Sequence, residues 1–270
     1  MWLGPAPGAQ IAAADRAQAD LARLRRLRGL SRPALAALIG GESAKARAYI
    51  ESAARVGVTA AQLRLGQMCL DGVDGGRDEV RAMAWFRLAA KAGDPMGLNM
   101  VGRGCELGWG GPVEPETAAR WYRRAAEAGS AWGAYNLANL HFIGRGVAQN
   151  LEACVNWLRR GVALAEHGQA LNLLARCREE GWGTGRDPEE AFDLYRRSAR
   201  TGYFRGRFNY ATLLYSKGQT ALALDEFAGA LADAPMLTRG CMLAIVRACG
   251  DHALDDLARR FADRESKEAS

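Results

Sequence analysis

The sequence predicts an all-α fold: a right-handed α-solenoid of stacked antiparallel helix pairs, in about five to six units of roughly 36 residues. Three observations support this prediction. Alanine and leucine are abundant and β-branched residues are scarce, which favours helices because alanine and leucine lose little freedom there. No stretch alternates apolar and polar residues for long enough to predict a strand. A pattern of aromatic and small residues also recurs along the chain, as expected for repeated helical hairpins.

The repeat is clearest in the second half of each unit. Tryptophans recur 36 residues apart, at Trp85, Trp121 and Trp157. Leu194 takes the corresponding place 37 residues after the last of them. In most units the tryptophan is followed by a large residue, a small pair such as Ala89-Ala90 and a glycine that ends the unit. We expect the third unit to be longer and to end at Gly168. Counting back 36 residues from the first tryptophan places a half-unit at 42–57.

Within the first half of each unit, a large residue recurs next to a small one. These pairs are Leu65-Gly66, Val101-Gly102, Leu137-Ala138, Leu174-Ala175 and Tyr210-Ala211. We expect the small member to let the partner helix approach closely, and the rings of the second half to fill the gap. Deleting such a buried ring is expected to cost about 3–5 kcal/mol.

Glycines separate the two halves of each unit. They are Gly72, Gly108, Gly144, Gly181 and, after a slip of one residue, Gly218. Glycine enters left-handed conformations freely, so each of them is expected to end a helix. Acidic residues such as Asp78 and Asp187 are expected to begin the next helix.

The combined motif is Ala-x-x-x-Leu-Gly-x-x-x-x-x-Gly-x-Gly-Val, then an alanine, an aromatic pair, Ala-Ala and glycine. It resembles the Sel-one-like repeat, a tetratricopeptide-like helical repeat. The unit from Ala134 to Gly161 carries most of this signature, and the resemblance covers roughly residues 42–234. It implies work as a scaffold or adaptor that binds a protein or peptide partner.

We expect four segments along the chain. Residues 1–14 form a flexible N-terminal segment, and residues 15–57 form N-terminal capping helices and the half repeat. The repeat array occupies residues 58–234, and a C-terminal capping hairpin with a polar outer face occupies residues 235–270.

The chain shows neither a secretory signal nor an apolar run approaching the ~18 residues of a membrane helix. It therefore predicts a cytoplasmic protein with no membrane partner. The six cysteines form no CxxC motif, and we expect them to be small buried hydrophobes and not a disulfide framework. The sequence gives no indication of the oligomeric state.

A solenoid of this type has an inner groove lined by the first helix of each unit. Residues there that the core pattern leaves free include an Asn–Arg pair at i, i+4 spacing that occurs twice. Asparagine can hydrogen-bond a peptide backbone in both directions, arginine can bind a carboxylate with two donors, and aromatic rings can anchor apolar groups. The predicted partner-binding residues are Met96, Asn99, Arg103, Trp132, Tyr135, Asn139, Phe142, Asn172, Arg176, Arg205, Phe208 and Tyr215. The alternative is a solvated polar face with pairs such as Arg103–Glu106.

The sequence does not predict an enzyme, a cofactor or a metal site. Its three histidines, at positions 141, 167 and 252, do not belong to any catalytic or metal-binding motif, and the glycine-rich stretches join helix to helix. An RNA-binding helical repeat is the second hypothesis, supported by the net charge of +6. Acidic residues in the same groove argue against nucleic acid: Glu106, Glu179 and Glu180. A specificity subunit of a separate enzyme would have the same sequence features as a scaffold.

Overall fold

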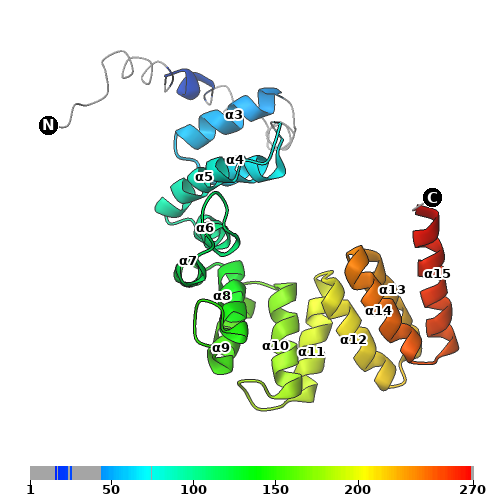
Figure 1. The fold of residues 1–270 in the computed structure, drawn as a ribbon. Coiled ribbons are helices and arrows are strands. Elements are labelled where there is room, and N and C mark those ends of the chain that lie inside the picture. Colours follow the sequence, from blue (N-terminus) through cyan, green and yellow to red (C-terminus); the bar gives the residue numbers. More distant parts are fainter. Residues whose placement is uncertain (1–15, 17, 24, 26–43, 74, 269–270) are drawn as a thin grey trace. The chain divides into compact units, whose positions relative to one another are not determined.

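The computed structural model describes residues 16, 18–23, 25, 44–73 and 75–268, and within these ranges the regular structure is helical, without strands (Figure 1). This confirms the all-α prediction. The expected flexible segment 1–14 and most of the N-terminal capping helices lie outside the described residues. The helices are α3 (Ala44–Arg55), α4 (Thr59–Asp71), α5 (Glu79–Lys91), α6 (Pro95–Leu107), α7 (Pro115–Glu127), α8 (Ala131–Ile143), α9 (Leu151–Leu164), α10 (Gly168–Glu180), α11 (Pro188–Arg200), α12 (Phe204–Ser216), α13 (Thr220–Asp233), α14 (Met236–Ala248) and α15 (His252–Glu268).

Consecutive helices pack against each other as hairpins, for example α4 with α5, α6 with α7, α10 with α11 and α12 with α13. The chain divides into two compact units, Met1–Gly133 and Ala134–Ser270, with the boundary inside α8. Unit 1 contains α3 to α7, and unit 2 contains α9 to α15. In unit 1, Asp20 accepts hydrogen bonds from Ser52 and from both Nε and Nη2 of Arg55, which ties the described N-terminal residues to α3.

The helix ends follow the predicted pattern at most positions. The glycines that separate the two halves of each unit, including the slipped Gly218, all have φ between 72° and 77°. Asp78 and Asp187 cap α5 and α11 by accepting hydrogen bonds from the backbone N–H groups of Arg81 and Glu190. The expected closure at Gly168 is wrong, because this glycine is the first residue of α10.

The residue that fills the core follows the repeat tryptophan or, in the fourth unit, follows Leu194. Phe86, Tyr122, Leu158 and Tyr195 are almost completely buried. Trp85, Trp121 and Trp157 are only half-buried. The guanidinium groups of Arg124 and Arg160 lie 4.4 Å and 5.5 Å from the ring centroids of Trp121 and Trp157. The tryptophans therefore lie at the margin of the core. Both the tryptophan and the residue after it were expected to be buried, and only the residue after it is.

The recurring small residues lie where consecutive helices touch. A Cβ atom on Gly97 of α6 would be 2.7 Å from the backbone nitrogen of Ala90 and 2.8 Å from the carbonyl carbon of Ala89. In the Val101-Gly102 pair, a Cβ on Gly102 would be 2.6 Å from the ring of Tyr122. This confirms that the small residues permit a close approach between helices.

Two units add a hydrogen bond between the two helices of the hairpin. The hydroxyl of Tyr122 donates to Glu106 at 2.6 Å, and the hydroxyl of Tyr195 donates to Glu179 at 2.7 Å. Burial raises the pKa of both tyrosines, so the hydroxyls stay protonated and available as donors. In the other two units the core residue is Phe86 or Leu158, which has no hydroxyl. The residue at the place of the glutamate is then apolar, Leu70 or Phe142.

The C-terminal hairpin differs from expectation in two ways. Cys69, Cys105, Cys154 and Cys177 are buried as expected, but Cys241 and Cys249 are exposed. The outer face of α14 is not polar, since Met236, Leu237 and Ile245 are all exposed. Among the described residues, no helix is both long enough and apolar enough to cross a membrane.

We predict that Gly97→Ala lowers the free energy of unfolding by about 1–3 kcal/mol, because the added methyl group meets rigid backbone. Gly240→Ala is the matched control: it lies on α14, and a Cβ there has no neighbouring atom within 4 Å. This control should be neutral or stabilising by about 0.5–1 kcal/mol. Urea unfolding measures both; equal effects would contradict the close-contact assignment.

We also predict that Tyr195→Phe costs about 1.5–3 kcal/mol, because the charged Glu179 loses a part-buried hydrogen bond. The double variant Tyr195→Phe/Glu179→Leu reproduces the pairing of Phe86 with Leu70 and should cost less than the sum of the single changes. A double-mutant cycle by urea unfolding measures this coupling, and strict additivity would count against the bond.

Candidate functional site

A groove of about 490 Å³ runs over α10, α12 and α14 in unit 2. These are the first helices of three consecutive hairpins, as the sequence predicts for a binding surface. We call it the α10–α12–α14 groove; it is lined by Asn172, Arg176, Arg205, Phe208, Asn209, Leu237, Thr238, Cys241, Met242 and Ile245. Four predicted partner-binding residues are therefore brought together: Asn172, Arg176, Arg205 and Phe208.

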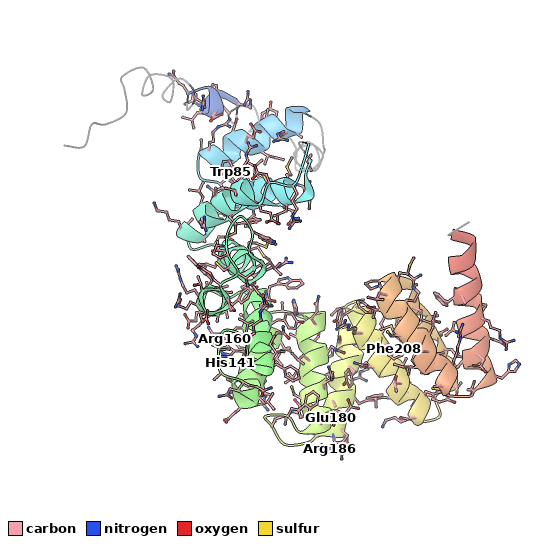
Figure 2. The ribbon with its side chains drawn as sticks, in the orientation of Figure 1. Trp85, His141, Arg160, Glu180, Arg186 and Phe208 are labelled. Carbon is pink, nitrogen blue, oxygen red and sulfur yellow. The ribbon has the colours of Figure 1, made fainter. Side chains whose placement is uncertain are left out.

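The fifth residues of α10 and α12 form the floor of the lining. Asn172 is the fifth residue of α10 and is 8% exposed; Phe208 is the fifth residue of α12 and is 6% exposed. Phe208, labelled in Figure 2, belongs to the core of the C-terminal hairpins. It packs edge-on against Phe227, with ring centroids 5.2 Å apart. The prediction that the core leaves Phe208 free is therefore wrong, because its ring packs against α13 in the core.

Two asparagines join neighbouring helices on this floor. Nδ2 of Asn209 in α12 donates a hydrogen bond of 2.8 Å to Oδ1 of Asn172 in α10. One amide can make more hydrogen bonds than this single contact uses. The remaining amide hydrogens of Asn172 and the Oδ1 of Asn209 make no other hydrogen bond within the described part of the chain. The pair therefore offers one donor and one acceptor to a ligand.

Two arginines supply the positive charge of the groove. The guanidinium of Arg176 lies 5.2 Å from the ring centroid of Trp182, and that of Arg205 lies 5.7 Å from that of Phe204. Neither arginine forms an ion pair with any described residue.

His167 positions the helix that carries Asn172 and Arg176. Its Nδ1 accepts a hydrogen bond of 3.2 Å from the backbone N–H of Ala170 and so caps α10. The imidazole is buried and lies 5.2 Å from the ring of Tyr135. Burial lowers the pKa of His167 from 6.5 to about 4, so the ring is neutral and can accept this hydrogen bond at neutral pH.

The predicted residues of unit 1 have mixed outcomes. Met96, Arg103 and Trp132 are exposed, but Asn99 is 2% exposed and its Nδ2 contacts the sulfur of Met96. The prediction that Asn99 is free for a partner is therefore wrong. Asn99 is the fifth residue of α6, and the same burial affects the fifth residues of α10 and α12.

The remaining predicted residues of unit 2 lie outside the groove lining and are half-buried. Tyr135 and Phe142 pack against the core, with Phe142 tilted on Trp182 at 5.5 Å. Tyr215 donates a hydrogen bond of 3.3 Å to Asp251. Asn139 is half-buried on α8.

Sequence reasoning missed the wall of the groove on α14. Leu237, Cys241 and Ile245 follow one another at intervals of four residues and so lie along one face of the helix. Asn209 was also missed, because the aligned positions pointed to its neighbour Phe208. The spacing on α14 was visible in the sequence but was assigned to the capping hairpin, whose outer face was expected to be polar.

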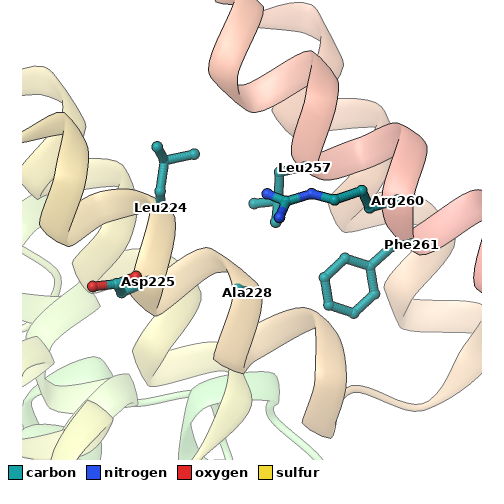
Figure 3. Close-up of a pocket in the computed structure, with 6 residues that line it drawn as sticks. All are labelled: Leu224, Asp225, Ala228, Leu257, Arg260 and Phe261. Atoms are coloured by element: carbon teal, nitrogen blue, oxygen red, sulfur yellow. The ribbon is translucent and has the colours of Figure 1, made fainter.

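A second cavity of about 300 Å³ lies between α13 and α15 (Figure 3). Its lining comes from second helices: Leu224, Asp225, Ala228, Leu257, Arg260 and Phe261. Asp225 and Arg260 carry opposite charges, so this cavity lacks the single sign of charge found in the α10–α12–α14 groove. The groove is therefore the stronger candidate.

We predict that acid weakens the cap on α10. The unfolded chain binds a proton at His167 with a pKa of about 6.5, whereas the folded chain resists protonation until about pH 4. Stability should therefore be lost as the pH falls from about 6.5 to about 4, by up to about 3 kcal/mol. The variant His167→Asn keeps a capping side chain that does not bind a proton in this pH range. The difference in unfolding free energy between the unmodified chain and this variant should therefore change with pH. A constant difference from pH 7 to pH 4.5 would contradict the assignment.

Comparison with known proteins agrees with this architecture. The family model described as Sel1 repeat matches residues 59–94, 95–130, 133–165 and 168–203, slightly more than half of the chain. A search of curated proteins gave no match.

Solved structures share the fold. The chain is similar to a Sel1 repeat protein from Oxalobacter formigenes, with a TM-score of 0.67 and 21% identity over 79% of this chain and 89% of that one. It is also similar to c5321, a protective antigen of uropathogenic Escherichia coli strains displaying an SLR fold, with a TM-score of 0.65 and 23% identity. That match covers 94% of this chain and 57% of the antigen.

The repeat matches and the hairpin architecture therefore agree. The chain belongs to the Sel1 repeat family, whose members are helical-repeat scaffolds that generally mediate protein–protein interaction.

Proposed function

We propose that this protein is a non-catalytic scaffold or adaptor that binds a protein or peptide partner in the α10–α12–α14 groove. The observation that carries this proposal is the combination of exposed apolar side chains and amide groups with further hydrogen-bonding capacity in one groove. Leu237 is 88% exposed and Ile245 is 52% exposed, and both lie beside the Asn172–Asn209 pair. Apolar patches rimmed by polar groups are typical of protein interaction sites.

The chemistry of the lining also supports a binding role. Of the described residues that line the groove, none is a carboxylate or a histidine, so Cys241 has no general base beside it within the lining. Partner binding needs only the apolar, amide and cationic groups that are present. A specificity subunit of a separate enzyme would be one form of such an adaptor.

The aliphatic wall favours protein over RNA. Proteins bind single-stranded RNA largely by stacking bases on exposed aromatic rings. The aromatic residue of the lining, Phe208, is buried, and the exposed wall consists of Leu237, Cys241 and Ile245. In unit 1, the exposed side chains of Met96, Arg103 and Trp132 are proposed as further contact residues for a partner.

The test is quantitative capture of proteins from cells that express the chain, on immobilised full-length protein. We expect Leu237→Lys/Ile245→Lys to reduce the captured partner at least about tenfold, because buried charges oppose docking. Leu222→Lys is the matched control, since Leu222 is 56% exposed on α13, outside the groove.

Circular dichroism should show that both variants remain folded, because all three leucine and isoleucine positions are exposed. Equal capture by the groove variant and the control would contradict the proposal. Recovery of RNA alone, lost after ribonuclease treatment, would favour the nucleic-acid hypothesis instead.

A further inference from the structure

The α10–α12–α14 groove carries positive charge that no described carboxylate neutralises. Arg176 and Arg205 line it, and no described aspartate or glutamate does. Two neighbouring arginines are paired: Arg178 with Glu190 at 2.6 Å and Arg207 with Glu226 at 3.2 Å. Arg176 and Arg205 line the groove without such a partner among the described residues.

Two acidic residues of α10 follow Arg176, and neither Glu179 nor Glu180 belongs to the groove lining. Glu179 accepts the hydrogen bond from the buried hydroxyl of Tyr195, which directs its carboxylate toward the hairpin interior. A ligand with carboxylates would therefore meet two arginines without competition from the lining. Charge-assisted hydrogen bonds from arginine to carboxylate are among the strongest available at a protein surface.

The two arginines lie at different levels of the groove. Arg205 is the second residue of α12, and Arg176 is the ninth residue of α10. At 1.5 Å of rise per residue, seven positions correspond to about 10 Å along the helix direction. The Asn172–Asn209 pair, from the fifth and sixth residues of these helices, lies between those levels.

The amide pair has the character of a binding element. Asn172 is more than nine-tenths buried and lines the groove, yet its amide hydrogens have no partner among the described residues. A peptide backbone supplies both the carbonyl that Asn172 lacks and an N–H group for the Oδ1 of Asn209.

Resting on the proposed function, we propose that the occupant is a protein segment in which apolar residues are flanked by carboxylates about 10 Å apart. Its carboxylates pair with Arg176 and Arg205, and its backbone bonds the Asn172–Asn209 pair. Its apolar side chains cover Leu237 and Ile245 on α14. Electrostatic complementarity selects this segment over neutral or basic ones.

The experiment selects random twelve-residue displayed peptides on the folded full-length chain. We expect enrichment of aspartate and glutamate beside aliphatic residues. Selection on the Leu237→Lys/Ile245→Lys variant identifies peptides that do not depend on the groove, and these are discarded. A synthetic fluorescein-labelled peptide of the selected sequence then serves as the probe for fluorescence anisotropy.

Arg176→Gln and Arg205→Gln should each weaken binding of this probe about tenfold. Arg159→Gln is the matched control, because Arg159 is exposed on α9 outside the groove, and it should leave the affinity unchanged. Raising the salt concentration should weaken binding to the unmodified chain more than to the Arg176→Gln/Arg205→Gln variant.

The outcomes separate this inference from the proposed function. Groove-dependent peptides without acidic enrichment, or an acidic probe insensitive to both arginine changes, would overturn the inference and leave the binding function standing. A complete lack of groove-dependent peptides, combined with tight binding of a labelled twenty-residue oligouridylate that requires both arginines, would overturn both.

Discussion

The close contact between consecutive helices is the constraint on which each unit depends. Where Gly97 meets Ala89 and Ala90, no space exists for even one additional carbon atom. Gly133 meets Ala125 and Ala126 in the same way. Because these contacts involve backbone atoms, the spacing between helices is fixed by the absence of side chains, and the neighbouring rings must fit the remaining volume. This explains why the chain repeats small residues as faithfully as large ones.

This constraint separates the part of each unit that packs from the part that can vary. Phe86, Tyr122, Leu158 and Tyr195 occupy the same place in four hairpins and are almost completely buried. The second and ninth residues of the first helices do not fill the core. In unit 2 these positions include Arg205, Leu237 and Arg176, which line the groove. A binding surface can therefore change its chemistry without changing the core, which suits a scaffold.

Much of the fold could be predicted from spacing alone. The period of 36 residues, the left-handed glycines at the ends of first helices and the acidic caps follow from local chemistry and are visible in one sequence. The binding surface was harder to predict, because periodicity identifies a helix face but not how deeply neighbouring helices cover it. Asn99 and Phe208 lie on the expected face and are nevertheless buried. The exposed wall of α14 was missed because residues 235–270 were assigned to a capping hairpin whose outer face was expected to be polar.

The most direct test that the groove residues are separate from the core is to truncate four exposed side chains of the lining together and measure the free energy of unfolding. The variant carries Arg176→Ala, Arg205→Ala, Leu237→Ala and Ile245→Ala, and urea unfolding is followed by circular dichroism. The account predicts a value within about 1 kcal/mol of the unmodified chain, as expected for surface substitutions outside the core. A loss of several kcal/mol would contradict it, because the lining would then be part of what holds unit 2 together.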